Sequence, residues 1–147
     1  MTSNGLKLNT GKIQFTCLGT SYQLAKVDTS IFVVNDIAVD LLCSVTCLGV
    51  SIDQELTFAD HIRSLACRCF FWIRQLRSVR QTLTSDIVIA LVDALIISRL
   101  DYCNSVLVGA CDIQLRQLQA VVNAAARLIA RRRKFNIISS TIRDVLH

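Results

Sequence analysis

The chain has 147 residues, of which 52% are apolar and 18% are charged. This balance excludes a disordered chain, and the length suffices for one domain with a buried core, or for the end of one domain joined to a small second one. The longest apolar stretch, 87–97, is too short to span a bilayer, and the N-terminus lacks the apolar core of a secretory signal. We therefore expect an intracellular protein, nuclear or cytoplasmic, that is not secreted and has no membrane partner.

The net charge of +5 is distributed unevenly along the chain. Residues 1–56 carry three Lys against five Asp and Glu, a balance of −2, whereas residues 57–147 carry thirteen Lys and Arg against six Asp and Glu, a balance of +7. A local excess of cations favours an anionic partner. The C-terminal part is therefore where a binding surface is expected.

Short stretches rich in β-branched and aromatic residues fill the first part of the chain. They predict three or four antiparallel strands, at 12–18, 30–34, 37–42 and 45–52. Asn35-Asp36 predicts a hairpin, because both residue types tolerate positive φ. The character of the sequence changes near residue 55, so we expect a β segment over 1–55 and a helical domain over 56–147.

The helical part begins with a long amphipathic pattern. Apolar residues recur in steps of four and three from Phe58 to Leu83 and predict one helix with a single apolar face. Thr57 is its expected N-cap, with Asp60 at the N3 position. His61 falls in the first turn, where we expect a surface or capping role rather than catalysis.

Two further helices are predicted downstream. The stretch 87–100 is apolar nearly all round, so we expect a central, buried helix in which Asp93 is the polar exception. A third helix over 112–132 carries an apolar stripe formed by Leu115, Leu118, Val122, Ala125 and Ile129. Ser139 or Ser140 is expected to cap a short fourth helix. The predicted fold class is α+β, a small antiparallel β meander followed by a three- to four-helix bundle.

The sequence gives little evidence for a metal-binding site or a catalytic nucleophile. The seven cysteines include no Cys-x-x-Cys pair, and we expect free, buried thiols. A zinc site can be drawn, but the spacing of its ligands fits no common module; they would be Cys43, Cys47, His61, Cys67 and Cys69. Asp36 with Asp40, and Asp53 with Glu55, are interpreted as turn and strand-edge acids rather than Mg²⁺ ligands. We expect no bound metal or cofactor.

The remaining candidates for a functional site are the positively charged residues on the predicted helices. The arginines of the first and third predicted helices lie opposite their apolar faces, and the densest basic tract follows at 131–134. These residues suit sequence-independent binding of a phosphate backbone, or equally a solvated helix end. Aromatic residues for base stacking are sparse, with Phe70 and Phe71 the only adjacent Phe pair. The candidate binding residues are Arg63, Arg74, Arg77, Arg116, Arg127, Arg131, Arg132, Arg133 and Lys134.

Three segments, in order, resemble one protein family. The sequence Leu-Lys-Leu-Asn at 6–9, followed by Lys12, is similar to the segment after the active-site hairpin of non-LTR (LINE-type) retrotransposon reverse transcriptases. Cys-Leu-Gly-Val at 47–50 resembles a hairpin that these enzymes use near the primer end. Ser-Arg-Leu-Asp-Tyr-Cys-Asn-Ser at 98–105, with Asn-Ala-Ala-Ala-Arg-Leu at 123–128, resembles the C-terminal region of jockey and chicken-repeat type elements. The resemblance covers nearly the whole chain.

The resemblance implies a palm remnant over 1–55 and a helical thumb over 56–147 of an RNA-directed DNA polymerase. The family's Mg²⁺ is held by aspartates in earlier motifs, and no Tyr-x-Asp-Asp or Phe-x-Asp-Asp sequence occurs here. We therefore expect that this chain alone is no enzyme. Lys12 is the family-derived catalytic candidate near the incoming nucleotide, although Ile13 stands where the family usually has Thr.

The chain is expected to be a polymerase fragment whose function is at most to bind primer–template nucleic acid through its basic helix faces. The implied partners are an RNA/DNA duplex and the missing N-terminal polymerase portion. Two alternatives remain open. One is a non-functional relic of a decayed element, and the other is a small helical module that binds a protein through exposed apolar surface.

Overall fold

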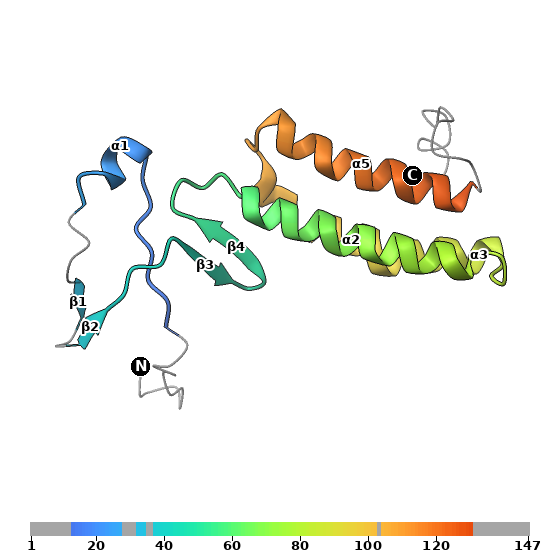
Figure 1. Ribbon diagram of the computed structural model, residues 1–147, viewed down its shortest axis with the longest axis horizontal. Helices are drawn as coiled ribbons and strands as arrows, with labels where there is room; N and C mark the ends of the chain where they lie inside the picture. The colour runs from blue at the N-terminus through green and yellow to red at the C-terminus, as the bar shows by residue number, and fades with distance from the viewer. Residues whose placement is uncertain (1–12, 28–31, 35–36, 103, 131–147) are drawn as a thin grey trace. The chain divides into compact units, whose positions relative to one another are not determined.

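The structure is a computed structural model that describes residues 13–27, 32–34, 37–102 and 104–130 (Figure 1). The chain divides into two compact units, Met1–Thr57 and Phe58–His147, which we call the N-terminal unit and the helical unit. The described strands lie in the first unit and the long helices in the second. The predicted α+β class is confirmed.

The strands of the N-terminal unit form two separate hairpins. Strands β1 (Phe32–Val34) and β2 (Ile37–Val39) pair antiparallel with Val34 opposite Ile37, which confirms the hairpin predicted there, although residues 35 and 36 lie outside the described residues. Strands β3 (Ser44–Cys47) and β4 (Val50–Asp53) form the second pair. The described strands are thus two two-stranded sheets and not one continuous meander.

The stretch 45–52, predicted as one strand, is divided by a tight turn. Leu48 and Gly49 both have positive φ, 49° and 83°. Two such residues in succession make the two-residue turn whose twist matches antiparallel strands. A hairpin is therefore present where the resemblance led us to expect one, and such hairpins occur in many folds.

The strand predicted at 12–18 is not formed by its described residues. Phe15 makes a single parallel bridge to Leu41, and its carbonyl oxygen accepts from the Leu42 N–H at 2.9 Å. The next element is a short helix, α1 (Ser21–Leu24), which the sequence pattern does not predict. Thr20 and Gln23 close a capping box at its start.

Helix α2 (Ala59–Val79) is the long amphipathic helix that the apolar pattern predicts. Its expected N-cap is wrong, because the helix starts after Phe58, whose φ is 56°. Thr57 instead bonds backward to Asp53, with its N–H donating to Oδ1 at 2.7 Å and its hydroxyl donating to Oδ2. The Asp53 carboxylate thus organises the turn after β4, consistent with its interpretation as a turn acid.

The apolar stretch 87–100 folds as several consecutive helical segments. These are α3 (Ser85–Val92), a π-helix (Asp93–Ile97) and α4 (Ser98–Asp101), and a 3₁₀-helix (Asn104–Leu107) follows. The expectation of a helix buried all round is wrong. Val88, Val92 and Ile96 are buried, but Ile87 is 48% exposed, and Asp93 is exposed as well. A helix at the edge of a small bundle buries only the face that packs against its neighbours, even when its other faces are also apolar.

Helix α5 (Asp112–Ile129) completes the helical unit and lies beside α2, running in the same direction (Figure 1). The predicted stripe is right in part, because Ala125 is buried and Leu118 and Ile129 pack against the core. Leu115 is 40% exposed, whereas Val121 and Leu128 are buried. The core of the unit joins α2, α3, the π-helix and α5 through buried side chains, the bulkiest being Leu65, Ile73, Leu76, Val88, Val92, Ile96, Val121 and Leu128. In the described part of the chain, no helix combines the length and hydropathy needed to cross a membrane.

Candidate nucleic-acid interface

A groove runs between α2 and α5 and has a volume of about 470 Å³. Helix α2 contributes residues spaced as one helix face, at i, i+3, i+4 and i+7, and α5 contributes residues at i, i+4 and i+7. Its lining residues are Phe70, Ile73, Arg74, Arg77, Ala120, Ala124 and Arg127. Two parallel helix faces therefore form one site.

Three of the predicted cations meet in this groove. Arg74 and Arg77 reach it from α2, where both are exposed, and Arg127 reaches it from α5, where it is half-buried. We call these three residues the groove arginines. They are 50 or more residues apart between the two helices in sequence, and the packing of α2 on α5 brings them together.

Arg127 differs from the other two in its surroundings. Its Nε atom is buried, and no described atom of the protein accepts a hydrogen bond from it. A buried N–H without an acceptor carries a desolvation cost. Arg127 is therefore held in the groove wall with one donor unsatisfied by the described atoms.

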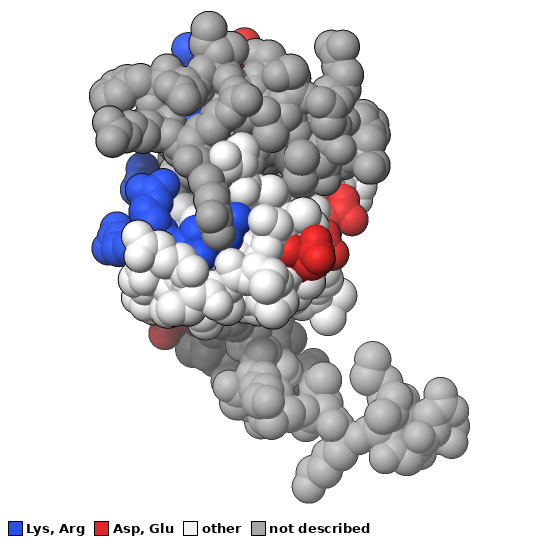
Figure 2. All heavy atoms as spheres, turned by 90° about the vertical axis from the view of Figure 1, so that its right-hand side faces the viewer, with Lys and Arg blue, Asp and Glu red and all other residues white. Residues whose placement is uncertain are grey.

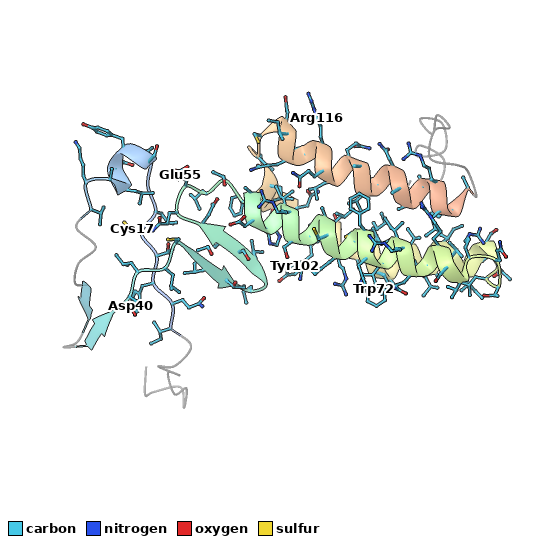
Figure 3. All side chains as sticks on the ribbon, in the orientation of Figure 1. Cys17, Asp40, Glu55, Trp72, Tyr102 and Arg116 are labelled. Atoms are coloured by element: carbon cyan, nitrogen blue, oxygen red, sulfur yellow. The ribbon has the colours of Figure 1, made fainter. Side chains whose placement is uncertain are left out.

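The other described candidates, Arg63 and Arg116, do not line the groove. Arg63 lies near the start of α2 and forms an exposed pair with Asp60 at 3.9 Å. Arg116 lies near the start of α5 and points away from α2 (Figure 3). Each precedes a groove arginine on its own helix by eleven residues, about 16 Å along the axis. They extend the basic surface without belonging to the groove.

The remaining predicted site residues lie outside the described residues. These are Lys12 and the basic tract Arg131, Arg132, Arg133 and Lys134.

Charges are segregated around the end of the helical unit. In the described surface that faces the viewer in Figure 2, most Lys and Arg side chains gather on the left and a patch of Asp and Glu lies on the right, with further acidic atoms at the lower left and at the top. A separate cavity of about 310 Å³ is lined by Asp86 and Asp93 among apolar residues. The groove, by contrast, is lined by three arginines and, among the described residues, by no Asp or Glu, which favours an anionic ligand.

Two residues that matter here are not among the candidate binding residues predicted from the sequence. Phe70 lines the groove and is 38% exposed. Its spacing of four residues from Arg74 places both on one helix face, and that spacing is the signal that identifies it. Arg80 is the second, and it is buried at 7% exposure with all three of its recorded hydrogen bonds on backbone carbonyls. Arg80 therefore stabilises the packing of the helices and is not part of the groove.

The expectation that the thiols are buried is wrong for most of the described ones. Cys69 is buried on α2, Cys17 is half-buried, and the exposed thiols are Cys43, Cys47, Cys67 and Cys111. Burial raises the pKa of the Cys69 thiol, and the nearby charges of Arg99 and Arg68 offset part of that rise. Within the described ranges, no three His, Cys, Asp or Glu side chains are grouped to hold a metal ion.

His61 is buried, which corrects its expected place at the surface. Burial lowers the pKa of its imidazole, and the positive charge of Arg68 lowers it further. Both effects favour the neutral ring. His61 is therefore not one of the cations of this surface near neutral pH.

Comparison of the chain with protein-family models, with curated proteins and with solved structures finds no match. The groove and its charges thus carry the functional argument on their own. Membership of the reverse transcriptase family, expected from the sequence resemblance, stays a proposal.

Proposed function

We propose that the helical unit binds the phosphate backbone of nucleic acid through the α2–α5 groove, with an RNA/DNA duplex as the ligand. The observation that carries this proposal is the convergence of Arg74, Arg77 and Arg127 on one groove. Guanidinium groups present planar, permanently charged donors that match phosphate oxygens. Three of them in one groove favour an anionic chain over a neutral ligand.

The character of the groove favours backbone contact over reading of base edges. Contacts to phosphates fix a protein on a nucleic acid without selecting its sequence. The groove arginines are joined by Phe70, Ile73 and two alanines, which offer no side-chain acceptor for a base edge. Binding is therefore sequence-independent and weakens as salt rises.

The proposal also includes an origin for the chain as the palm and thumb segment of a non-LTR retrotransposon reverse transcriptase. The sequence resemblance at 6–12, 47–53 and 98–128 supports it. A thumb needs helices that contact the backbone of a primer–template duplex, and a basic groove between two helices suits that task. The chain alone performs no polymerisation, because it lacks the aspartate motifs that hold Mg²⁺.

The test compares two double variants of α2 that remove the same charge. Arg74→Ala with Arg77→Ala removes two groove arginines, and Arg63→Ala with Arg68→Ala removes two exposed arginines outside the groove. We expect the first to weaken binding of an RNA/DNA duplex about tenfold or more, and the second to weaken it less. Equal losses would show that net charge, and not the groove, governs binding. A primer-extension assay with Mg²⁺ is expected to yield no product.

A second candidate function is favoured by apolar residues exposed on the helical unit. Phe71 is 50% exposed, Ile87 48% and Ile89 39%. Exposed apolar side chains in this number suit a protein-interaction module. Sedimentation of the purified chain over a range of concentrations tests it, since self-association or aggregation that Ile87→Ser with Ile89→Ser abolishes would assign these residues to a contact.

A further inference from the structure

The apolar end of the α2–α5 groove has no role in binding a phosphate backbone. Phe70 and Ile73 from α2 meet Ala120 and Ala124 from α5 there. Ile73 is buried at 3% exposure, whereas Phe70 is 38% exposed. A partly exposed aromatic ring thus lies at one end of a groove whose other end is lined by Arg77 and Arg127.

We propose that this groove binds one unpaired nucleotide, with its base against the ring of Phe70 and its phosphate on the groove arginines. The inference rests on the function proposed above and names the form of nucleic acid that the groove takes. It adds an unpaired nucleotide, at a single-stranded end or gap, to the duplex backbone that the groove arginines are proposed to contact.

The order of residues along the two helices fits such a ligand. On α2 the groove passes from Phe70 to Arg77, and on α5 it passes from Ala120 to Arg127, seven residues or about 10 Å in each case. Because α2 and α5 run in the same direction, both helices place apolar residues at one end and a cation at the other. A nucleotide has the same polarity, an aromatic base at one end and an anionic phosphate at the other.

The size and walls of the groove agree with this ligand. Its volume of about 470 Å³ lies within the range of about 300–1,000 Å³ usual for small-molecule sites. Ala120 and Ala124 carry only methyl groups opposite the face of α2 that holds the ring, so little side-chain bulk fills the space. The half-buried Arg127 lines the cationic end of the groove and places its positive charge there for the phosphate.

We propose an unpaired nucleotide and not a paired one, because a base within a duplex is stacked on both faces. Aromatic side chains reach a base face only in single strands, ends or gaps. Every base has such a face, and the apolar end offers no polar side chain to distinguish one base edge from another. The groove therefore takes any base.

The test measures binding of the full chain to a single-stranded oligonucleotide and to the corresponding blunt duplex by fluorescence anisotropy. Phe70→Leu removes the ring and keeps an apolar side chain. Phe71→Leu is the matched control, because Phe71 is 50% exposed on the same helix and does not line the groove. We expect Phe70→Leu to weaken single-strand binding about tenfold while duplex binding changes little. Phe71→Leu should change neither, and Phe70→Trp should retain single-strand binding.

A single-stranded oligonucleotide with 2-aminopurine at one position gives an independent readout. Stacking on Phe70 should quench its fluorescence in the wild-type complex and not in the Phe70→Leu complex. Equal single-strand affinity of wild type and Phe70→Leu would overturn the inference. If the arginine variants still lose duplex binding in that case, the proposed function stands without the nucleotide site. If wild type binds neither ligand, the proposed function and the inference both fail.

Discussion

The Nε atom of Arg80 donates a hydrogen bond to the carbonyl oxygen of Leu128 at 3.1 Å, and this contact ties the end of α2 to the end of α5. Nη2 donates to the next carbonyl, that of Ile129, at 3.2 Å, and Nη1 donates to Leu83 at 3.1 Å. The last carbonyls of a helix have no partner within the helix, and a cation there also opposes the negative end of the helix dipole. Arg80 therefore holds together the end of the helix pair that carries the groove arginines.

Substitution of Arg80 tests this structural role. Arg80→Lys keeps the charge but cannot present the planar donors that reach three carbonyls, so we expect a loss of about 2 kcal/mol in the free energy of unfolding. Urea denaturation measures it. Arg68→Lys, at an exposed position of α2, is the control and should change stability by less than about 0.5 kcal/mol. Equal stability of the Arg80→Lys variant and wild type would contradict the role.

The burial pattern of the apolar stretch 87–100 gives a second prediction. Ile96 is fully buried and Ile87 is 48% exposed. Ile96→Ala should therefore lower the free energy of unfolding by about 2–5 kcal/mol through lost burial and a cavity. Ile87→Ala should cost clearly less, as measured by the same denaturation. If both substitutions cost the same, the segment would be buried on all sides, as its composition alone suggested.

Helix α2 and the apolar stretch 87–100 differ in how well the sequence could predict their buried faces. The period of apolar residues predicted α2, because one stripe in a polar helix has only one way to face a core. The stretch 87–100 has apolar residues on every side, so its period cannot say which face is buried. Which of Val88, Ile87 and Ile89 is covered depends on where α2 and α5 pack.

The candidate site was predictable in part for the same reason. Each helix period placed Arg74 and Arg77 on one side of α2, and Arg127 on one side of α5. That these two sides border one groove depends on the tertiary packing of α2 on α5, which no local pattern encodes. Phe70 is linked to the groove by its helical spacing from Arg74, one turn further on, and its adjacency to Phe71 gives no sign of this.

The cysteines provide a prediction on pH. The pKa of the buried Cys69 thiol is raised by burial above its value in the unfolded chain. An acid whose folded pKa is raised contributes its full stability below the unfolded pKa, near 8.5, and loses it as the pH rises through the folded pKa. We expect Cys69→Ala to have a flatter loss of stability above about pH 8.5 than wild type in urea titrations. Parallel curves would contradict the burial of this thiol.

Thiol labelling distinguishes the same residues at neutral pH. The exposed Cys43, Cys47, Cys67 and Cys111 should react within the fast phase of labelling with a disulfide reagent, while Cys69 should react only when the protein opens. Mass spectrometry of the labelled peptides identifies each site. Fast labelling of Cys69 in the native protein would contradict the packing of α2.

The two units should differ in their resistance to hydrogen exchange. In the N-terminal unit, Val50 is the only apolar side chain, among those whose burial is described, that is buried. Two-stranded hairpins with so little core are marginal in water, whereas α2 and α5 share a continuous core. Amides of β3 and β4 should exchange faster than those in the middle of α2. Equal protection of both would mean that the hairpin draws on packing beyond its own strands.

The salt dependence of duplex binding tests the central claim most directly. The logarithm of the association constant should fall linearly with the logarithm of salt concentration for wild type binding an RNA/DNA duplex. Each phosphate contact contributes about 0.9 to the slope for double-stranded DNA, and a similar value is expected here. Removal of Arg74 and Arg77 together should therefore make the slope shallower by about two, while the Arg63→Ala with Arg68→Ala variant changes it less. A slope unchanged by the groove variant, or binding independent of salt, would contradict the assignment of the groove to a phosphate backbone.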